Sequence, residues 1–158
     1  MISLRETFRK LVRNGVDFVV VGGVAATLHG SATATFDLDI CYSRTTDNLE
    51  RLANALADLS PRLRGAPPGL PFLWDCETLR RGFNFTLTTG FGDIDILGDI
   101  AGVGSFDEVK AASQTIEAFV LRLAVLSLEA LIRAKRAAGR DKDLRAIPEL
   151  EALKEASD

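Results

Sequence analysis

The feature that most constrains the fold is a short apolar run that ends in two adjacent glycines. Residues 17–21 read DFVVV, and Gly22 and Gly23 follow directly. A continuous run of this kind is typical of a strand covered on both faces, which requires a layered fold with a sheet inside. Residues 24–29 then favour a short helix. The run therefore predicts a central strand that passes through a tight turn straight into a helix.

Three further segments alternate between apolar and polar residues, which is the period of a β-strand. They are residues 36–41 (FDLDIC), 83–89 (FNFTLTT) and 91–97 (FGDIDIL). The last two are separated only by Gly90, so together they predict a hairpin.

This alternation predicts that the acidic side chains of each segment share one face. Residues two apart in a strand lie about 6.6 Å from each other on the same side, so Asp37 and Asp39 should point out together. The same holds for Asp93 and Asp95. Like charges side by side repel unless a cation lies between them, and hard divalent cations prefer oxygen ligands. The acidic side chains of the two strands could thus converge on metal ions. The alternative interpretation is that these side chains are exposed to solvent and bind no metal. The residues expected to point into the core from the first segment are Phe36, Leu38 and Ile40.

The rest of the chain predicts helices and a few short strands. Apolar residues recur at helical spacing after Ser3, after Asp47 and over residues 127–138. Residues 61–71 hold four of the five prolines and predict a loop, and Pro148 should interrupt the last helix. Residues 116–126 supply one or two more strands. We therefore expect the α/β (α+β) class, with helices packed on a mixed sheet, as one domain over residues 1–158 with a helical part at 127–158.

Composition and charge exclude several functional classes. The formal net charge of −3 argues against wholesale phosphate neutralisation, although residues 127–145 hold six basic against three acidic side chains. Two cysteines, Cys41 and Cys76, are too few for a disulfide scaffold or a Cys-rich zinc site. One histidine, His29, makes a Ser/His/Asp site difficult to assemble, and we interpret it as a surface residue favoured by the helix dipole or as a packing residue, not as a catalyst. No signal peptide or membrane span is evident, which predicts a cytoplasmic protein without a membrane partner.

The order of these motifs resembles the small bacterial nucleotidyltransferases of the polymerase-beta-like superfamily. It is most similar to the AbiEii-like nucleotidyltransferase toxins of type IV toxin–antitoxin systems. The segments that carry the resemblance are GGVAATLHG, TFDLDI, GDIDIL and LEALIRAKRAAGRDKDL, and together they extend over about residues 16–153.

The resemblance implies a nucleotidyltransferase fold and an Mg²⁺-dependent transfer of a nucleoside monophosphate from an NTP to an acceptor hydroxyl. The implied acceptor is a tRNA or a protein, and the implied partner is a cognate toxin or antitoxin. It also implies that Asp37, Asp39 and Asp95 are the metal-binding and catalytic carboxylates. The nucleotide-binding residues that it implies are Gly22, Gly23, Lys135, Arg140 and Lys142.

Alternatives remain open at this point. Relatives often carry arginine four residues before the first metal aspartate, and here that residue is Thr33, which favours a nucleotide-binding pseudoenzyme or interaction module of the same fold. A sugar transferase with a DXD motif is a second alternative, but the glycine pair before the acids argues against it. The positive segment 127–145 could guide an acceptor, or could be a solvated helix.

Overall fold

The fold is built on a seven-stranded mixed sheet, seen in a computed structural model that describes residues 2–67 and 69–157. The strand order is β3-β4-β5-β2-β1-β9-β8. Strand β1 is parallel to β9, β2 is parallel to β5, and the other neighbours are antiparallel. A separate two-stranded ribbon joins β6 to β7. The strands are β1 (Phe18–Val21), β2 (Leu38–Tyr42), β3 (Arg62–Leu63), β4 (Phe85–Thr89), β5 (Gly92–Leu97), β6 (Asp99–Ile100), β7 (Gly104–Ser105), β8 (Ser113–Ala118) and β9 (Leu121–Leu126).

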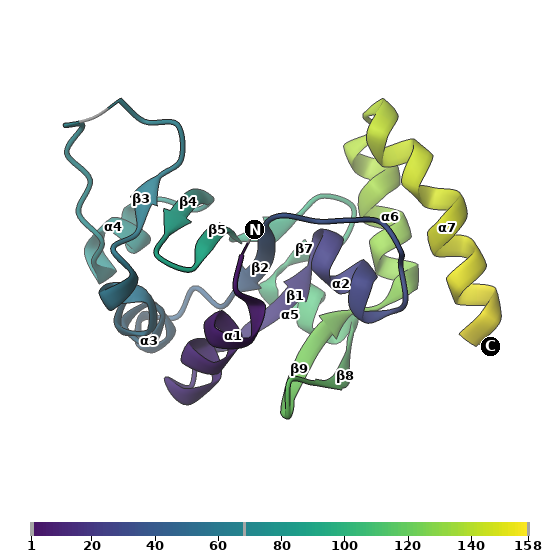
Figure 1. Cartoon of the computed structure of the whole chain (residues 1–158), viewed down its shortest axis with the longest axis horizontal. Coiled ribbons are helices and arrows are strands. Elements are labelled where there is room, and N and C mark those ends of the chain that lie inside the picture. Colours follow the sequence, from purple (N-terminus) through teal and green to yellow (C-terminus); the bar gives the residue numbers. More distant parts are fainter. Residues whose placement is uncertain (1, 68, 158) are drawn as a thin grey trace.

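Helices gather at the two ends of the molecule (Figure 1). Helices α1, α3 and α4 lie toward the β3 end, while α6 and α7 form an antiparallel pair at the opposite end of the molecule. Within the described residues, no helix is both long enough and apolar enough to cross a membrane. The helices are α1 (Leu4–Arg13), α2 (Gly22–Leu28), α3 (Thr46–Leu56), the 3₁₀ turn η1 (Ala57–Leu59), α4 (Cys76–Arg81), α5 (Phe106–Ala111), α6 (Leu128–Ala138) and α7 (Asp141–Ser157).

The core confirms the central strand and the hairpin expected from the sequence. All four residues of β1 are buried between β2 and β9, and α2 begins at the residue after this strand. Strands β4 and β5 pair as the predicted hairpin. On the buried face, the side chains of Leu38, Ile40, Ile94 and Ile96 have no solvent exposure. The mixed α/β class is therefore the one that the order of helices and strands predicted.

Three sequence-based expectations were wrong in detail. Phe36 is 63% exposed, because β2 begins only at Leu38 and the residues before it have left the ladder. The proline-rich segment contains the two-residue strand β3, which pairs with β4 at the sheet edge. Helix α7 continues through Pro148 without interruption. Buried Ile147 and Leu150 flank that proline and pack the helix on the core, which offsets the one hydrogen bond that proline cannot donate.

Candidate active site

The site lies on a polar face that four neighbouring strands build in the same way. Each contributes a tripeptide with an apolar middle residue: RLR at 62–64, TLT at 86–88, DID at 93–95 and DLD at 37–39. The middle residues are register partners across the sheet, in the pairs Leu63–Leu87, Leu87–Ile94 and Leu38–Ile94. Because side chains alternate between the faces of a strand, the flanking polar residues gather on the other face.

Asp39 lies on β2, at the end of this face nearest β1. In the sheet it lies opposite Asp95 of β5 on one side and Val21 of β1 on the other. Burial, together with the carboxylates of Asp95 and Asp37, raises the pKa of Asp39 to about 7, while Lys135 acts in the opposite direction. Negative charge is thus concentrated where the strand β1 ends and the turn to α2 begins.

The glycine pair lets the backbone of this turn approach the acidic face. Gly22 has φ +64°, a left-handed conformation that favours glycine, and a Cβ there would overlap Oδ2 of Asp39. A Cβ on Gly23 would lie 2.7 Å from Oγ1 of Thr35. Neither position has room for a side chain, so the turn leaves its backbone facing the cleft next to Asp39.

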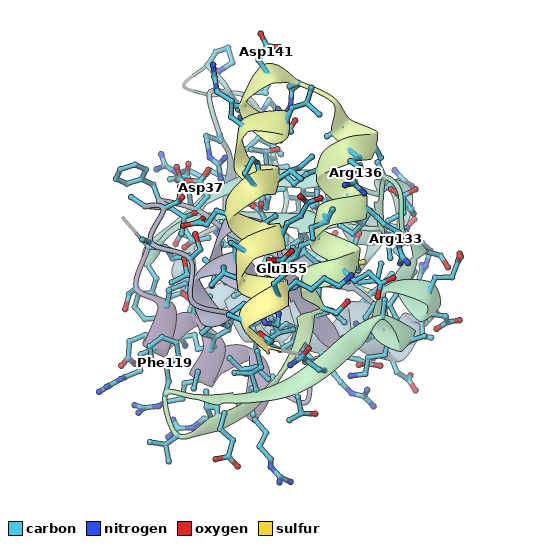
Figure 2. The ribbon with its side chains drawn as sticks, turned by 90° about the vertical axis from the view of Figure 1, so that its right-hand side faces the viewer. Asp37, Phe119, Arg133, Arg136, Asp141 and Glu155 are labelled. Atoms are coloured by element: carbon cyan, nitrogen blue, oxygen red, sulfur yellow. The ribbon has the colours of Figure 1, made fainter. Side chains whose placement is uncertain are left out.

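A cleft of about 380 Å³ joins this turn to the C-terminal helices. Gly22, Gly23 and Asp39 line one wall, and Lys135, Arg140 and Lys142 line another. Figure 2 shows α7 running alongside α6, with Asp141 at the end where α7 begins. A second hollow of about 230 Å³ shares Gly22, Asp39, Lys135, Arg140 and Asp143 with this cleft. Asp99 also lines it, and much of the rest of its lining is apolar, including Leu97, Ile100, Leu126 and Leu131.

Two of the basic residues of the cleft are held by one buried carboxylate. Asp143 is 1% exposed, and its Oδ2 accepts a hydrogen bond from Arg140 Nε at 2.6 Å. Lys135 Nζ lies 3.4 Å from Oδ1 of the same residue. The hydrogen bond from Arg140 is the main reason why the pKa of Asp143 is below its usual value. We call Lys135, Arg140 and Asp143 the helix cluster.

Arg64 is the residue of this site that the sequence analysis missed. Its guanidinium lies among three carboxylates, at 2.8 Å from Asp95, 3.2 Å from Asp93 and 3.6 Å from Asp37. We call these residues and Asp39 the sheet cluster. The proline-rich context predicted a loop here, and the RLR alternation was the one signal that could have placed Arg64 on the acidic face.

The predicted site residues therefore come together, but not as a closed ligand set. Asp37, Asp39 and Asp95 share one face with Asp93, and Gly22 and Gly23 adjoin the cleft with Lys135, Arg140 and Lys142. Among the residues that the structure describes, no three His, Cys, Asp or Glu side chains are arranged to hold a metal ion as they stand. Arg64 occupies the space where three of the carboxylates meet. The ring nitrogen of His29 lies 2.8 Å from the carbonyl oxygen of Leu126, as expected for a packing residue.

Comparisons with known proteins identify the fold. No family model and no curated protein matches the sequence. Among solved structures, the chain is similar to the lincosamide antibiotic adenylyltransferase LnuA, solved with lincomycin bound. The TM-score is 0.62 at 15% identity, over 96% of this chain and 98% of that one.

Two further structures agree. A candidate nucleotidyltransferase of Thermotoga maritima, TM1012, gives a TM-score of 0.61 at 18% identity, over 94% of each chain. The antibiotic-resistance factor ANT(2'')-Ia gives 0.55 at 14% identity, over 97% of this chain and 88% of that one. At these identities the similarity establishes a nucleotidyltransferase fold.

Proposed function

We propose that the protein is a nucleotidyltransferase that moves a nucleoside monophosphate from an NTP to an acceptor hydroxyl, with Mg²⁺ as cofactor. The observation that carries this proposal is the position of Asp39. It adjoins Asp95 on the sheet, the backbone at Gly22, and the cleft that contains Lys135. Acceptors for a cation and donors for a phosphate thus meet at one residue, within a fold shared with nucleotidyltransferases.

The nucleotide would lie in the cleft between the glycine turn and α6. With no side chain at Gly22 or Gly23, a triphosphate can approach the backbone closely. Lys135 and Arg140 would supply positive charge from the opposite wall, where Asp143 fixes their positions. The apolar hollow beside Asp39 suits the flat face of a nucleobase or an apolar part of the acceptor.

The donor set fits a divalent cation in chemistry. Asp37, Asp39 and Asp95 offer the oxygen ligands that Mg²⁺ prefers. Oδ1 of Asp95 is buried and accepts no hydrogen bond, although Arg64 is close to it. These three carboxylates would hold the cation, which, when bound, would neutralise charge on the transferring phosphoryl group.

The acceptor that we propose is a hydroxyl on a tRNA or on a protein, in line with a role in a toxin–antitoxin pair. LnuA was solved with lincomycin bound, and the similarity covers 96% of this chain and 98% of LnuA. A hydroxyl on a small molecule is therefore an alternative acceptor that the experiment must include. The helix cluster lies at the cleft where either acceptor would approach.

A nucleotide-binding pseudoenzyme of the same fold is the second candidate. Thr33, which stands where relatives often have arginine, donates its hydroxyl hydrogen bond to Glu149 of α7 at 3.2 Å. Ser31 and the backbone of Ala32 also donate to this carboxylate. The loop is therefore tied to α7 instead of presenting a cation to the phosphates.

A transfer assay distinguishes the two candidates. The purified chain is incubated with Mg²⁺, each of the four NTPs labelled at the α-phosphate, and total tRNA, a protein mixture or lincomycin. We expect label on a tRNA or a protein, and none with an Asp39→Asn variant. Label on lincomycin alone would overturn the proposed acceptor class. Nucleotide binding without transfer to any acceptor would favour the pseudoenzyme, and absence of nucleotide binding would exclude both.

A variant in which Lys135, Arg140 and Lys142 are all replaced by alanine tests whether these basic residues bind the nucleotide or guide the acceptor. If these residues hold the nucleotide, NTP affinity falls in the triple variant. If they guide the acceptor, NTP affinity is retained while transfer slows. With an RNA acceptor, its binding would then also depend less steeply on salt.

A further inference from the structure

Arg64 reaches the acidic face from the edge of the sheet. It follows the two-residue strand β3, and its backbone N–H donates to the carbonyl of Thr86 at 2.9 Å. The side chain crosses β4, where Nη2 donates to the carbonyl of Leu87 at 2.8 Å. The guanidinium then arrives above β5 and β2. The backbone hydrogen bond to Thr86 thus fixes the Cα of Arg64 beside β4. The guanidinium at the other end of the side chain reaches the carboxylates of β5 and of the residue before β2.

The contacts of Arg64 with the carboxylates are close but poorly aligned. Arginine usually binds a carboxylate through parallel N–H···O bonds, which give both strength and a fixed geometry. Here Arg64 Nε and Asp95 Oδ1 are both buried without a hydrogen-bond partner, even though Arg64 lies 3.2 Å from Asp93 and 2.8 Å from Asp95. The guanidinium therefore acts mainly through its charge.

The charge balance leaves the sheet cluster far from neutral. One guanidinium faces Asp93, Asp95 and Asp37, and Asp39 adjoins them without an ion pair to Arg64. Removing that guanidinium would leave carboxylates side by side on neighbouring strands, which is strongly unfavourable. A divalent cation would bring twice the charge to the same oxygens.

We propose that Arg64 is a displaceable counter-ion that competes with the divalent cation for Asp37 and Asp95. The inference rests on the proposed function, because that function supplies the cation. Arg64 holds the carboxylates together on the sheet and gives them up when the cation binds. Its side chain is 26% exposed, so the guanidinium can move toward solvent while β3 stays paired with β4.

Mn²⁺ binding to the whole chain without nucleotide tests this inference. The free Mn²⁺ is measured by electron paramagnetic resonance for the wild type, Arg64→Ala, Arg64→Gln, Arg64→Lys and the control Arg62→Ala. Arg62 is exposed on β3, two residues before Arg64, and makes none of these ion pairs. We expect Arg64→Ala and Arg64→Gln to lower the Kd about tenfold, a change of about 1.4 kcal/mol. Arg64→Lys, which keeps the charge, and Arg62→Ala should stay close to the wild type.

Thermal unfolding provides a second measurement, because a simple loss of packing would not make the Tm of the variant more sensitive to Mn²⁺. Without divalent cation, Arg64→Ala should unfold at a lower temperature than the wild type, because its carboxylates repel. Saturating Mn²⁺ should raise its Tm by more than it raises the wild-type Tm. Adding Asp95→Asn to Arg64→Ala should abolish the tighter Mn²⁺ binding. Arg64→Gln, whose side chain is closer in size, repeats both tests if the alanine variant does not fold.

The possible failures can be told apart. Equal or weaker Mn²⁺ binding by both Arg64→Ala and Arg64→Gln, with a wild type that binds Mn²⁺, would overturn the inference and leave the proposed function standing. No saturable Mn²⁺ binding by any variant would overturn the inference together with the cation part of the proposed function. Tighter binding by the variants, without transfer to any acceptor, would support the role of Arg64 and overturn the proposed transfer.

Discussion

The two charge clusters beside Asp39 have opposite compositions. In the sheet cluster a single arginine faces three carboxylates, whereas in the helix cluster a single carboxylate, Asp143, holds Lys135 and Arg140. The carboxylate of the helix cluster is buried and accepts well-aligned hydrogen bonds. The sheet cluster is partly exposed and contains two buried polar atoms without hydrogen bonds.

This difference indicates that the side chains of the helix cluster are fixed in place, whereas the sheet cluster can exchange its counter-ion. A buried carboxylate with aligned partners fixes the cations around it, and it leaves an excess of positive charge toward the cleft. A partly exposed group of acids with one unaligned arginine leaves an excess of negative charge that another cation can bind. The helix cluster is thus suited to position side chains for an anion, and the sheet cluster is suited to exchange its counter-ion.

The largest effect should come from Asp39→Asn, which removes the carboxylate of the sheet cluster that lines the same cleft as the helix cluster. We expect divalent-cation-dependent nucleotide binding to weaken by more than about a hundredfold, since a first ligand should matter more than the outer partners of a metal site. Calorimetric titration with an NTP and Mg²⁺ measures this. Asp107→Asn, on the exposed start of α5, is the control and should bind as the wild type does. Unchanged binding by Asp39→Asn would remove Asp39 from the site.

Gly22→Ala should disturb the sheet cluster and leave the helix cluster in place. The new Cβ would overlap the Asp39 carboxylate, and the positive φ adds strain of about 1–2 kcal/mol. We expect a comparable loss of unfolding free energy and weaker cation binding. Gly15→Ala is the matched control, because Gly15 has φ +68° and its nearest neighbour would be an ordinary 3.8 Å from the Cβ. If both variants bind cations equally well, the close approach at Gly22 has no role in the site.

Asp143→Asn should disturb the helix cluster through stability. Losing a buried, charge-assisted hydrogen bond should cost about 1–3 kcal/mol at neutral pH. Because the folded-state pKa of Asp143 lies below its ordinary value of 3.8, its ionised form stabilises the fold above that pH. This contribution is lost as the pH falls through the lower, folded-state value. Urea unfolding of wild type and variant should therefore show a gap that is constant near neutrality and closes in acid. A gap that widened in acid would contradict the assignment.

The smallest effect should come from Thr33→Ala, which removes one exposed hydrogen bond to Glu149. We expect nucleotide affinity to change by less than about tenfold, because interactions of exposed carboxylates contribute little. Thr33→Arg is the informative companion variant. If the missing arginine is what limits binding, Thr33→Arg should tighten NTP binding in the same titration, and no change would remove the main argument for a pseudoenzyme.

Sequence reasoning succeeded where the structural cause is local. The alternation of the DLD and DID segments was sufficient to place Asp37, Asp39, Asp93 and Asp95 on one face, because the period of a strand is a property of the backbone. The valine run predicted the buried central strand for a similar reason.

The same reasoning failed where the position of a residue depends on pairing or packing between segments that are distant in sequence. Strand β3 is two residues long and pairs with β4, which is distant in sequence, so only the short RLR alternation indicated a strand within the proline-rich segment. Phe36 continues the alternation in sequence, yet it lies outside the paired part of β2. The burial of Asp143 depends on α6 packing against α7, a contact that no short motif specifies.

The shared row of apolar residues beneath the polar face has a consequence for how this chain can vary. A slip of β5 by one residue against β4 would turn Asp93 and Asp95 into the core and Ile94 outward. Such a slip would disrupt the core and the polar face together. A substitution at any of the four aspartates, by contrast, leaves the row Leu63, Leu87, Ile94 and Leu38 untouched. Descendants of this chain could therefore lose the proposed transfer by a single substitution and still keep the fold.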